Sequence, residues 1–551
     1  MKKIIYIFLI LGYCCKSQTN CSYWSTYIGK TDADEVKGIA VDNSKNSYII
    51  MQTQSQSLTT TPGLISDTLK GFYDAYIAKF DSCGNFLWGT YLGTTGFDSG
   101  EKIVICPDGG IAFTGYSQAV GLPTTSLSCF QPTFAGQSDC FVGKISPNGN
   151  LIWLTYFGKS NYDLAFDIAC DFSGNLFIGG TTTSTNLFTN ATSFQQTFGG
   201  NTDAFIAKFN SSGNFKWCTY YGGAGTEDIH ALTSDVFGNI FGCGGTNSFN
   251  LNTSIGCLQP NKDASFDCYI IKLDSTGTRI FSTYLGGSGT DDCYGLVADN
   301  TGNIYIGGQT TSANFTTTVA AYQPTLAGMQ DAFLTKLSGT GNLLFSTYFG
   351  GNDNDVTVRI KFYNNQIYTF ITTASANLPM LGMQTYSTLA GNQNIAVARF
   401  NTNGTPNYST YFGSSNFGTD YAADFEVKNN SLFLAGKSSS GNYPTTTGAF
   451  QPTYGFNDDG FLTRLPINSP LVTNLMVTPS KKDLVFFPNP ATTVLNFKGT
   501  FNTAQTIEIY NLLGQLKISQ PIIDNQLIIS DLEVGIYFFK LNGLSNKFVK
   551  N

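Results

Sequence analysis

Short hydrophobic runs separated by glycine-rich and polar turns recur along the chain with a period of about 64 residues. A Thr-Tyr pair, with Gly two residues after the Tyr, appears in seven copies, as in WSTYIG and FSTYLGG. The Tyr residues are Tyr27, Tyr91, Tyr156, Tyr220, Tyr284, Tyr348 and Tyr411. A fixed period of this length is typical of repeat folds, so the repeat has to be identified before any local element.

A second element, typified by DAFIAKF, places an acidic or amide residue five positions before a cation. Between this element and the preceding Tyr lies a two-strand pattern around an Asp-x-x-Gly-Asn turn, as in residues 295–308. Each repeat therefore predicts four strands: A before that turn, B after it, C with the acid and cation, and D with the Tyr. The seven pairs are Asp74/Lys79, Asp139/Lys144, Asp203/Lys208, Asp267/Lys272, Asp331/Lys336, Asn394/Arg399 and Asp459/Arg464.

The two ends of the repeat region complement each other. The repeats begin with a lone D strand at residues 23–28 and end with an unpartnered C strand at residues 460–465. These strands form a hairpin only in a closed ring, which hides the sheet edges that a linear stack would expose. We therefore predict an all-β fold whose residues 22–466 form a seven-bladed β-propeller, with the N-terminal strand completing the last blade.

Side chains at opposite ends of strand C point to different faces, so its acid and cation are expected to bridge neighbouring strands or blades. The Tyr of strand D has no base nearby and is expected to pack between blades.

The repeats resemble the SBBP β-propeller repeat family through WSTYIG, SGTDD, SGNIYIGG and DAFLTKL. The resemblance extends from Trp24 to about Pro466. The sixth repeat departs from it, because residues 361–366 replace the Asp-x-x-Gly-Asn turn and Asn394 replaces Asp. The resemblance implies a propeller and says little about activity, since propellers carry unrelated functions.

The pattern changes after the repeats. Residues 467–483 lack periodicity and are predicted to be a linker, and residues 484–551 carry short alternating strands typical of a small β-sandwich. This segment resembles the type A C-terminal sorting domain of the type IX secretion system through PNPA, IYNLLGQ and GIYFFKL. The resemblance implies that the type IX machinery is a partner, and that the tail is removed or exchanged for a surface anchor after passage through the outer membrane.

The N-terminus is predicted to direct export. Lys2 and Lys3 precede a short apolar run, so residues 1–17 are predicted to be a cleaved signal peptide. No later run is long and apolar enough to cross a membrane. We expect the mature protein outside the cell or on its outer surface.

Composition excludes several classes of function. The formal net charge is −7 and basic residues do not cluster in the body of the chain, so nucleic acid is not expected as a partner. The single histidine, His230, excludes two-His metal sites and leaves most acid–base schemes without a base. Its slot in the repeat varies, and we interpret it as a surface or packing residue. The aligned residues are Lys37, Lys102, Phe166, Tyr294, Thr357 and Ala422.

One set of carboxylates recurs in the glycine-rich loop between strands D and A. The loop leads from the outermost strand to the innermost, so these acids are expected on one rim of the ring. A ring of seven would bind Ca²⁺ or a cationic ligand. The alternative is that each acid accepts hydrogen bonds from its own loop. Beyond this Ca²⁺ no cofactor is expected. The acids are Asp34, Asp98, Asp163, Glu227, Asp291, Asp355 and Asp420.

Cysteine spacing suggests two disulfides. Cys129 and Cys140 are eleven residues apart, and Cys257 and Cys268 repeat this spacing two repeats later. Disulfides persist in exported proteins, so both pairs are candidates.

For function, we expect a non-catalytic surface or secreted scaffold that binds an extracellular protein or glycan, because no blade carries a pair of acids that the other blades lack. The alternative is a carbohydrate-active enzyme that works with carboxylates alone. The loops between strands B and C, such as residues 181–202, are long and variable, whereas most A-to-B and C-to-D turns are short. Antiparallel order places the B-to-C and D-to-A loops on the same face, so any partner is expected to dock there.

Overall fold

The computed structural model describes residues 21–125, 129–263, 266–382, 386–415, 417–467, 485–487, 490–498, 506–511, 515–521, 526–541 and 544–550. The predicted signal peptide and all of the predicted linker except Ile467 lie outside these residues. The chain divides into two compact units, residues 1–474 and 475–551.

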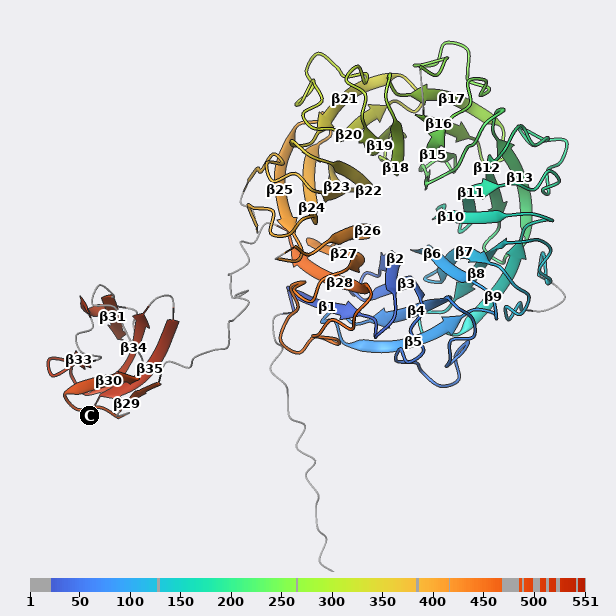
Figure 1. Cartoon of the computed structure of the whole chain (residues 1–551). Coiled ribbons are helices and arrows are strands. Elements are labelled where there is room, and N and C mark those ends of the chain that lie inside the picture. The colour runs from blue at the N-terminus through green and yellow to red at the C-terminus, as the bar shows by residue number, and fades with distance from the viewer. Residues whose placement is uncertain are drawn as a thin grey trace, which may run out of the picture. The chain divides into compact units, whose positions relative to one another are not determined.

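The first unit contains seven four-stranded antiparallel sheets arranged in a ring (Figure 1). Blade one comprises β2 (Asp34–Val41), β3 (Ser47–Thr53), β4 (Asp74–Phe80) and β5 (Phe86–Leu92). Blade two comprises β6 (Asp98–Ile105), β7 (Ile111–Ser117), β8 (Asp139–Ile145) and β9 (Leu151–Phe157). Blade three comprises β10 (Asp163–Cys170), β11 (Leu176–Thr182), β12 (Asp203–Phe209) and β13 (Phe215–Tyr221).

Blade four comprises β14 (Ala231–Ser234), β15 (Ile240–Thr246), β16 (Asp267–Leu273) and β17 (Arg279–Leu285). Blade five comprises β18 (Asp291–Ala298), β19 (Ile304–Thr310), β20 (Asp331–Leu337) and β21 (Leu343–Phe349). Blade six comprises β22 (Asp355–Tyr363), β23 (Gln366–Thr373), β24 (Asn394–Asn401) and β25 (Pro406–Phe412). Blade seven comprises β26 (Asp420–Lys428), β27 (Ser431–Ser438), β28 (Asp459–Pro466) and β1 (Trp24–Ile28).

The first strand of each blade lies nearest the centre of the ring and the last strand lies at the outside (Figure 1). Strand β1 pairs with β28 over its whole length, from Trp24 opposite Arg464 to Ile28 opposite Gly460. The ring is therefore closed by strands from the two ends of the repeat region. A disulfide between Cys21 and Cys83 joins the residues just before β1 to the turn after β4.

Side chains of strands C and D connect the blades. Lys79 Nζ and Trp88 Nε1 of blade one both donate to the carbonyl oxygen of Pro147 in blade two, at 3.1 Å each. Tyr220 of β13 packs in a core that includes Phe157 of β9. These contacts confirm the predicted roles of the strand C cation and of the Tyr between blades.

The second unit has a three-stranded sheet, β29-β30-β33, and a four-stranded sheet, β32-β31-β34-β35. Its core contains Leu495, Ile509 and Phe539. The predicted fold class, a seven-bladed β-propeller followed by a small β-domain, is confirmed. The strands are β29 (Val485–Phe487), β30 (Val494–Lys498), β31 (Thr506–Asn511), β32 (Leu516–Pro521), β33 (Gln526–Ile528), β34 (Gly535–Leu541) and β35 (Leu544–Lys550). Among the described residues, no helix has the length and apolar character needed to cross a membrane.

Candidate functional site

Six of the seven inner strands contain a β-bulge near their start, and the seventh has one just before it. In β2 the pairing with β3 moves from Val36 directly to Gly38, so Lys37 has no partner in the ladder. The same skip occurs in β6, β10, β18, β22 and β26. In blade four, Glu227 pairs with Thr246 and Ala231 with Cys243, which leaves one extra residue before β14. The residue three positions after the loop acid is Lys37, Glu101, Phe166, His230, Tyr294, Val358 or Ala423.

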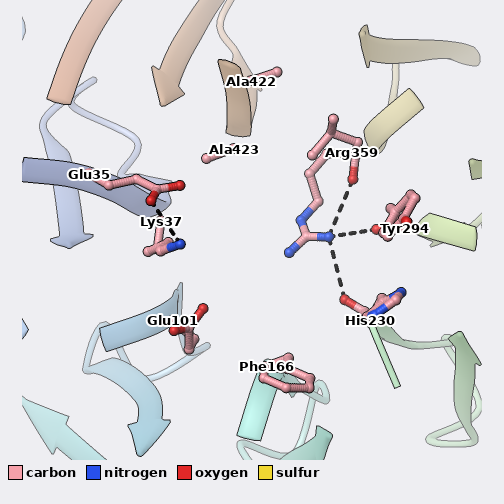
Figure 2. Close-up of a pocket in the computed structure, with 10 residues that line it drawn as sticks. Glu35, Lys37, Glu101, Phe166, His230, Tyr294, Arg359, Ala422 and Ala423 are labelled. Atoms are coloured by element: carbon pink, nitrogen blue, oxygen red, sulfur yellow. Dashed lines mark hydrogen bonds and ion pairs between the residues drawn. The ribbon is translucent and has the colours of Figure 1, made fainter. Parts of the chain in front are cut away.

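All seven of these residues line one pocket of about 320 Å³ at the centre of the ring. Figure 2 shows the labelled side chains directed from different blades toward a common space. Glu35, Arg359 and Ala422 complete the lining. A bulge releases a side chain from the sheet and redirects it, so the propeller contributes one pocket residue per blade. We call this site the channel pocket.

The wall from blades three to five is aromatic. The rings of His230 and Tyr294 stack with centroids 4.8 Å apart, and Phe166 lies 6.4 Å from His230. The opposite wall is charged, because Lys37 Nζ lies 3.0 Å from a carboxylate oxygen of Glu35 and Glu101 also faces the pocket. The pocket therefore offers flat apolar surfaces on one side and hydrogen-bonding groups on the other.

His230 lies between two carboxylates. Its Nε2 is 3.2 Å from Asp228 and its Nδ1 is 3.4 Å from Asp292. Burial alone would lower the pKa of His230, but Asp228 and Asp292 raise the pKa well above its usual value. The three side chains are the one group of possible metal ligands among the described residues. Because the His230 ring itself occupies the position between the two acids, we assign no metal there.

Arg359 and an ion pair between blades two and seven fix the pocket. Arg359 Nη1 donates to the backbone carbonyl oxygens of Tyr294 and His230, at 2.5 and 3.4 Å (Figure 2). Lys102 Nζ lies 2.7 Å from Asp424, and both side chains are buried. Burial alone would raise the pKa of Asp424, but Lys102 and the neighbouring cations hold the pKa below its usual value. These contacts keep the inner segments of blades two, four, five, six and seven in fixed positions around the pocket.

The seven loop acids do not form the predicted Ca²⁺ site. Each is at most 1% exposed. Asp163, for example, accepts hydrogen bonds from the backbone N–H of Lys159 and from the hydroxyl of Ser184 in the B-to-C loop of its own blade. The set is not among the groups of described residues with metal-ligand geometry. The Ca²⁺ interpretation is therefore wrong for Asp34, Asp98, Asp163, Glu227, Asp291, Asp355 and Asp420, and the loop-binding alternative describes them.

The loop acids also lie close to the strand C acids. Burial, with a smaller contribution from the nearby Asp163, raises the pKa of Asp139 to about 7. Burial, with a smaller contribution from Asp34, raises the pKa of Asp459 to about 7. Between blades six and seven the pair is an amide and an acid, and Asn394 Nδ2 donates to Asp420 Oδ2 at 3.1 Å.

The predicted disulfides are not formed, since Cys129, Cys140, Cys257 and Cys268 are all free thiols. Cys140 and Cys268 are fully buried at the second residue of strand C, where the other blades have Ala75, Ala204, Ala332, Ile395 and Gly460. The repeated spacing therefore reflects a buried position that takes a small side chain in all blades except blade six.

His230, which we interpreted as a surface or packing residue, lines the channel pocket, where its ring stacks on Tyr294 and pairs with Asp228 and Asp292. In three blades the residue equivalent to His230 is one position away from the one that the repeat predicted. The bulged residues there are Glu101, Val358 and Ala423, and not Lys102, Thr357 and Ala422.

The pocket lies at the start of the inner strands, at the end of the ring that carries the D-to-A and B-to-C loops. The hydrogen bonds of the loop acids join these two kinds of loop, as in the bond between Asp34 and Ser55. Exposed hydrophobic side chains stand on both, including Phe72 and Phe249 on B-to-C loops and Phe417 on a D-to-A loop.

Comparison with known proteins confirms both resemblances. Residues 24–58, 152–188 and 280–316 match the β-propeller repeat family SBBP, and residues 485–551 match the secretion system C-terminal sorting domain. The sorting domain indicates secretion to the cell surface or the extracellular space, and implies contact with the secretion machinery.

Among individual proteins, the chain is 23% identical over 375 residues to the regulatory protein FlaEY of Caulobacter vibrioides, covering 64% of this chain and 38% of FlaEY. It thus spans little more than a third of that relative. Similar solved structures include Sqt1 from Chaetomium thermophilum, at 9% identity and a TM-score of 0.36, covering 81% of this chain and 99% of Sqt1. The polysaccharide lyase Uly1 has 9% identity and a TM-score of 0.40, covering 79% of this chain and 90% of Uly1.

Proposed function

We propose that this secreted propeller is a non-catalytic binding protein for an extracellular glycan, and that the channel pocket holds one sugar residue of that glycan. The observation that carries the proposal is the set of seven bulges, which direct one side chain from every blade into a single pocket. Nothing in the ladder of the sheets requires these side chains, so their convergence favours a ligand site.

The chemistry of the pocket suits a sugar. Phe166 and Tyr294 are partly exposed and offer flat apolar surfaces for the C–H groups of a pyranose ring. Glu35, Lys37 and Glu101 supply acceptors and a donor for hydroxyl groups on the other side. A few convergent polar groups beside aromatic surfaces in a pocket of this size are typical of small-ligand sites. The exposed side chains on the surrounding loops would contact the rest of the chain of sugars.

The distribution of acids favours binding over catalysis. A glycosidase needs a carboxyl group whose pKa is raised toward neutrality and which reaches the substrate. In this protein the carboxyl groups whose pKa is raised to about 6 or 7, such as those of Asp139 and Asp459, are fully buried and are bound by their own loops. They are out of reach of a ligand in the pocket.

A glycan array probed with the purified mature protein tests the proposal. We expect retention of one glycan class, and at least a tenfold loss of affinity in Tyr294→Ala and Phe166→Ala. The matched control is Phe172→Ala, which removes an exposed aromatic ring from the turn between β10 and β11 on the opposite face. Its affinity should stay unchanged.

Two outcomes contradict the proposal. Release of shortened or unsaturated sugars during incubation would establish the carbohydrate-active enzyme instead. Equal binding by the wild type and both pocket variants would place the ligand elsewhere.

A loop replacement then distinguishes a protein ligand from a sugar. Short Gly-Asn turns in place of the B-to-C loops of blades three and five should abolish binding of a protein held by the loops, but not of a sugar held by the pocket.

A further inference from the structure

Two cysteines from adjacent blades meet near the ends of their inner strands. The sulfur atoms of Cys106 and Cys170 are 2.9 Å apart. Cys106 follows β6 in blade two and Cys170 is the last residue of β10 in blade three. Both belong to the same core, in which Cys106 is 2% exposed and Cys170 is partly buried.

The repeat does not explain the cysteine at position 106. It begins the A-to-B turn, and its backbone makes the same bond, from its N–H to the carbonyl of Gly110, that Asp42 makes to Asn46. The carboxylate of Asp42 also accepts the N–H groups of Ser44 and Asn46 and so holds its turn together. Equivalent aspartates occupy this position in blades three, four and five: Asp171, Asp235 and Asp299.

Cys106 has therefore lost a turn-stabilising carboxylate. The residue gained is a thiol directed at Cys170, whose own position is occupied by Val41, Ile105, Ser234 and Ala298 in other blades. The two cysteines stand at different steps of the repeat, so a shared repeat position does not account for both. Cys106 replaces an aspartate that stabilises the turn in other blades, and its thiol contacts a thiol of the next blade. A joint role of the two cysteines is the simplest explanation.

We propose that Cys106 and Cys170 form a disulfide between blades two and three in the secreted protein. The sorting domain indicates that the mature chain is in an oxidising environment, and the Cys21–Cys83 bond shows that a disulfide fits this fold. A hydrogen bond from Cys170 lowers the pKa of Cys106, and Lys144 acts in the same direction, which favours the thiolate that starts the exchange.

The oxidant is the disulfide bond of a thiol oxidase or of a small disulfide-containing molecule in the same compartment. The Cys106 thiolate attacks one sulfur of this disulfide, a mixed disulfide forms, and the first thiolate leaves. Cys170 then loses its proton and attacks the Cys106 sulfur, which releases the second thiolate. The two cysteines lose two protons and two electrons, and the oxidant becomes two thiols.

Peptide mapping of the mature protein from the culture medium tests the proposal without a variant. Free thiols are blocked with iodoacetamide under denaturing conditions, and the protein is digested without reductant by trypsin and an enzyme that cleaves before Asp. Cleavage after Lys102 and before Asp108, Asp167 and Asp171 gives the peptides Ile103–Pro107 and Asp167–Cys170. We expect these two peptides as one linked species.

The Cys21–Cys83 peptide serves as the internal control for oxidation. If that peptide is linked while Ile103–Pro107 and Asp167–Cys170 are both alkylated, the proposal is overturned. A stability comparison gives a second test: Cys106→Ser/Cys170→Ser should melt about 4 °C below the unreduced wild type, because a cross-link closing a loop of this length is lost. Cys257→Ser, which removes a partly exposed free thiol, should melt with the wild type.

Discussion

Replacing Asp139 by Asn should make the propeller more stable at neutral and alkaline pH. Asp139 Oδ2 accepts hydrogen bonds from Gln131 Nε2 and the N–H of Ala135, each at 2.8 Å. Its Oδ1 is buried without a hydrogen-bond partner, and the nearby Asp163 adds to the cost of its charge. An amide keeps the acceptor and puts a donor beside Asp163, as Asn394 of blade six does beside Asp420 of blade seven.

The magnitude follows from the shift of the pKa from 3.8 to about 7. A raised carboxyl pKa stabilises the folded state fully below pH 4, and this contribution is lost as the pH rises through 7. The shift corresponds to roughly 4 kcal/mol, and residual solvent screening reduces it, so we expect a gain of about 2 kcal/mol at pH 8 and almost none at pH 4. For a propeller of this size that is about 2 °C in the melting midpoint.

The assay is calorimetry of the mature protein between pH 4 and pH 8, following the propeller transition. The reciprocal variant Asn394→Asp places a second acid beside Asp420 and should lose a similar amount at pH 8. The reasoning is refuted if Asp139→Asn melts at or below the wild type at pH 8, or if Asn394→Asp shows the pH dependence of the wild type.

Three further perturbations test other parts of the structure. Lys102→Met leaves Asp424 buried without its closest cation and should lower the free energy of unfolding, measured by chemical denaturation, by about 3 kcal/mol. Lys361→Met, the control in the more exposed pair with Glu426, should lower it by less than about 1 kcal/mol. Tyr220→Phe removes the hydroxyl that bonds Ser184 and Leu187 and should cost about 1 to 2 kcal/mol, measured by the shift of the unfolding midpoint. Deleting residues 484–551 should keep the protein in the periplasm without changing the melting of the propeller; appearance of the truncated protein in the medium would show that the sorting assignment is wrong.

The repeat made the fold predictable. Seven copies of the Tyr and of the strand C pair set the number of blades, and the lone strands at the two ends indicated how the ring closes. The Cys21–Cys83 bond was missed because the two residues meet only once β1 lies beside β28 in the closed ring.

The pocket was harder to predict because a bulge is a property of pairing between strands. Similarity alone aligned Lys102 with Lys37, whereas the ladder releases Glu101. A signal was nevertheless present, since each bulged residue lies three positions after the loop acid, and Glu227 leads to His230 by this count. The loop acids were also only partly predictable. Their recurrence was evident in the sequence, but their hydrogen-bond partners, such as Ser55 for Asp34, belong to a loop about twenty residues away.

The bulges separate the lining of the pocket from the pairing of the strands. A side chain such as Tyr294 or Ala423 has no partner residue in the ladder, so its replacement leaves the paired residues of its blade in place. Such positions can change one at a time, each altering one sector of the same pocket while the loop acids continue to bind their D-to-A and B-to-C loops. Descendants of one propeller, or a designer working blade by blade, can thereby change the lining of the pocket without first rebuilding the protein.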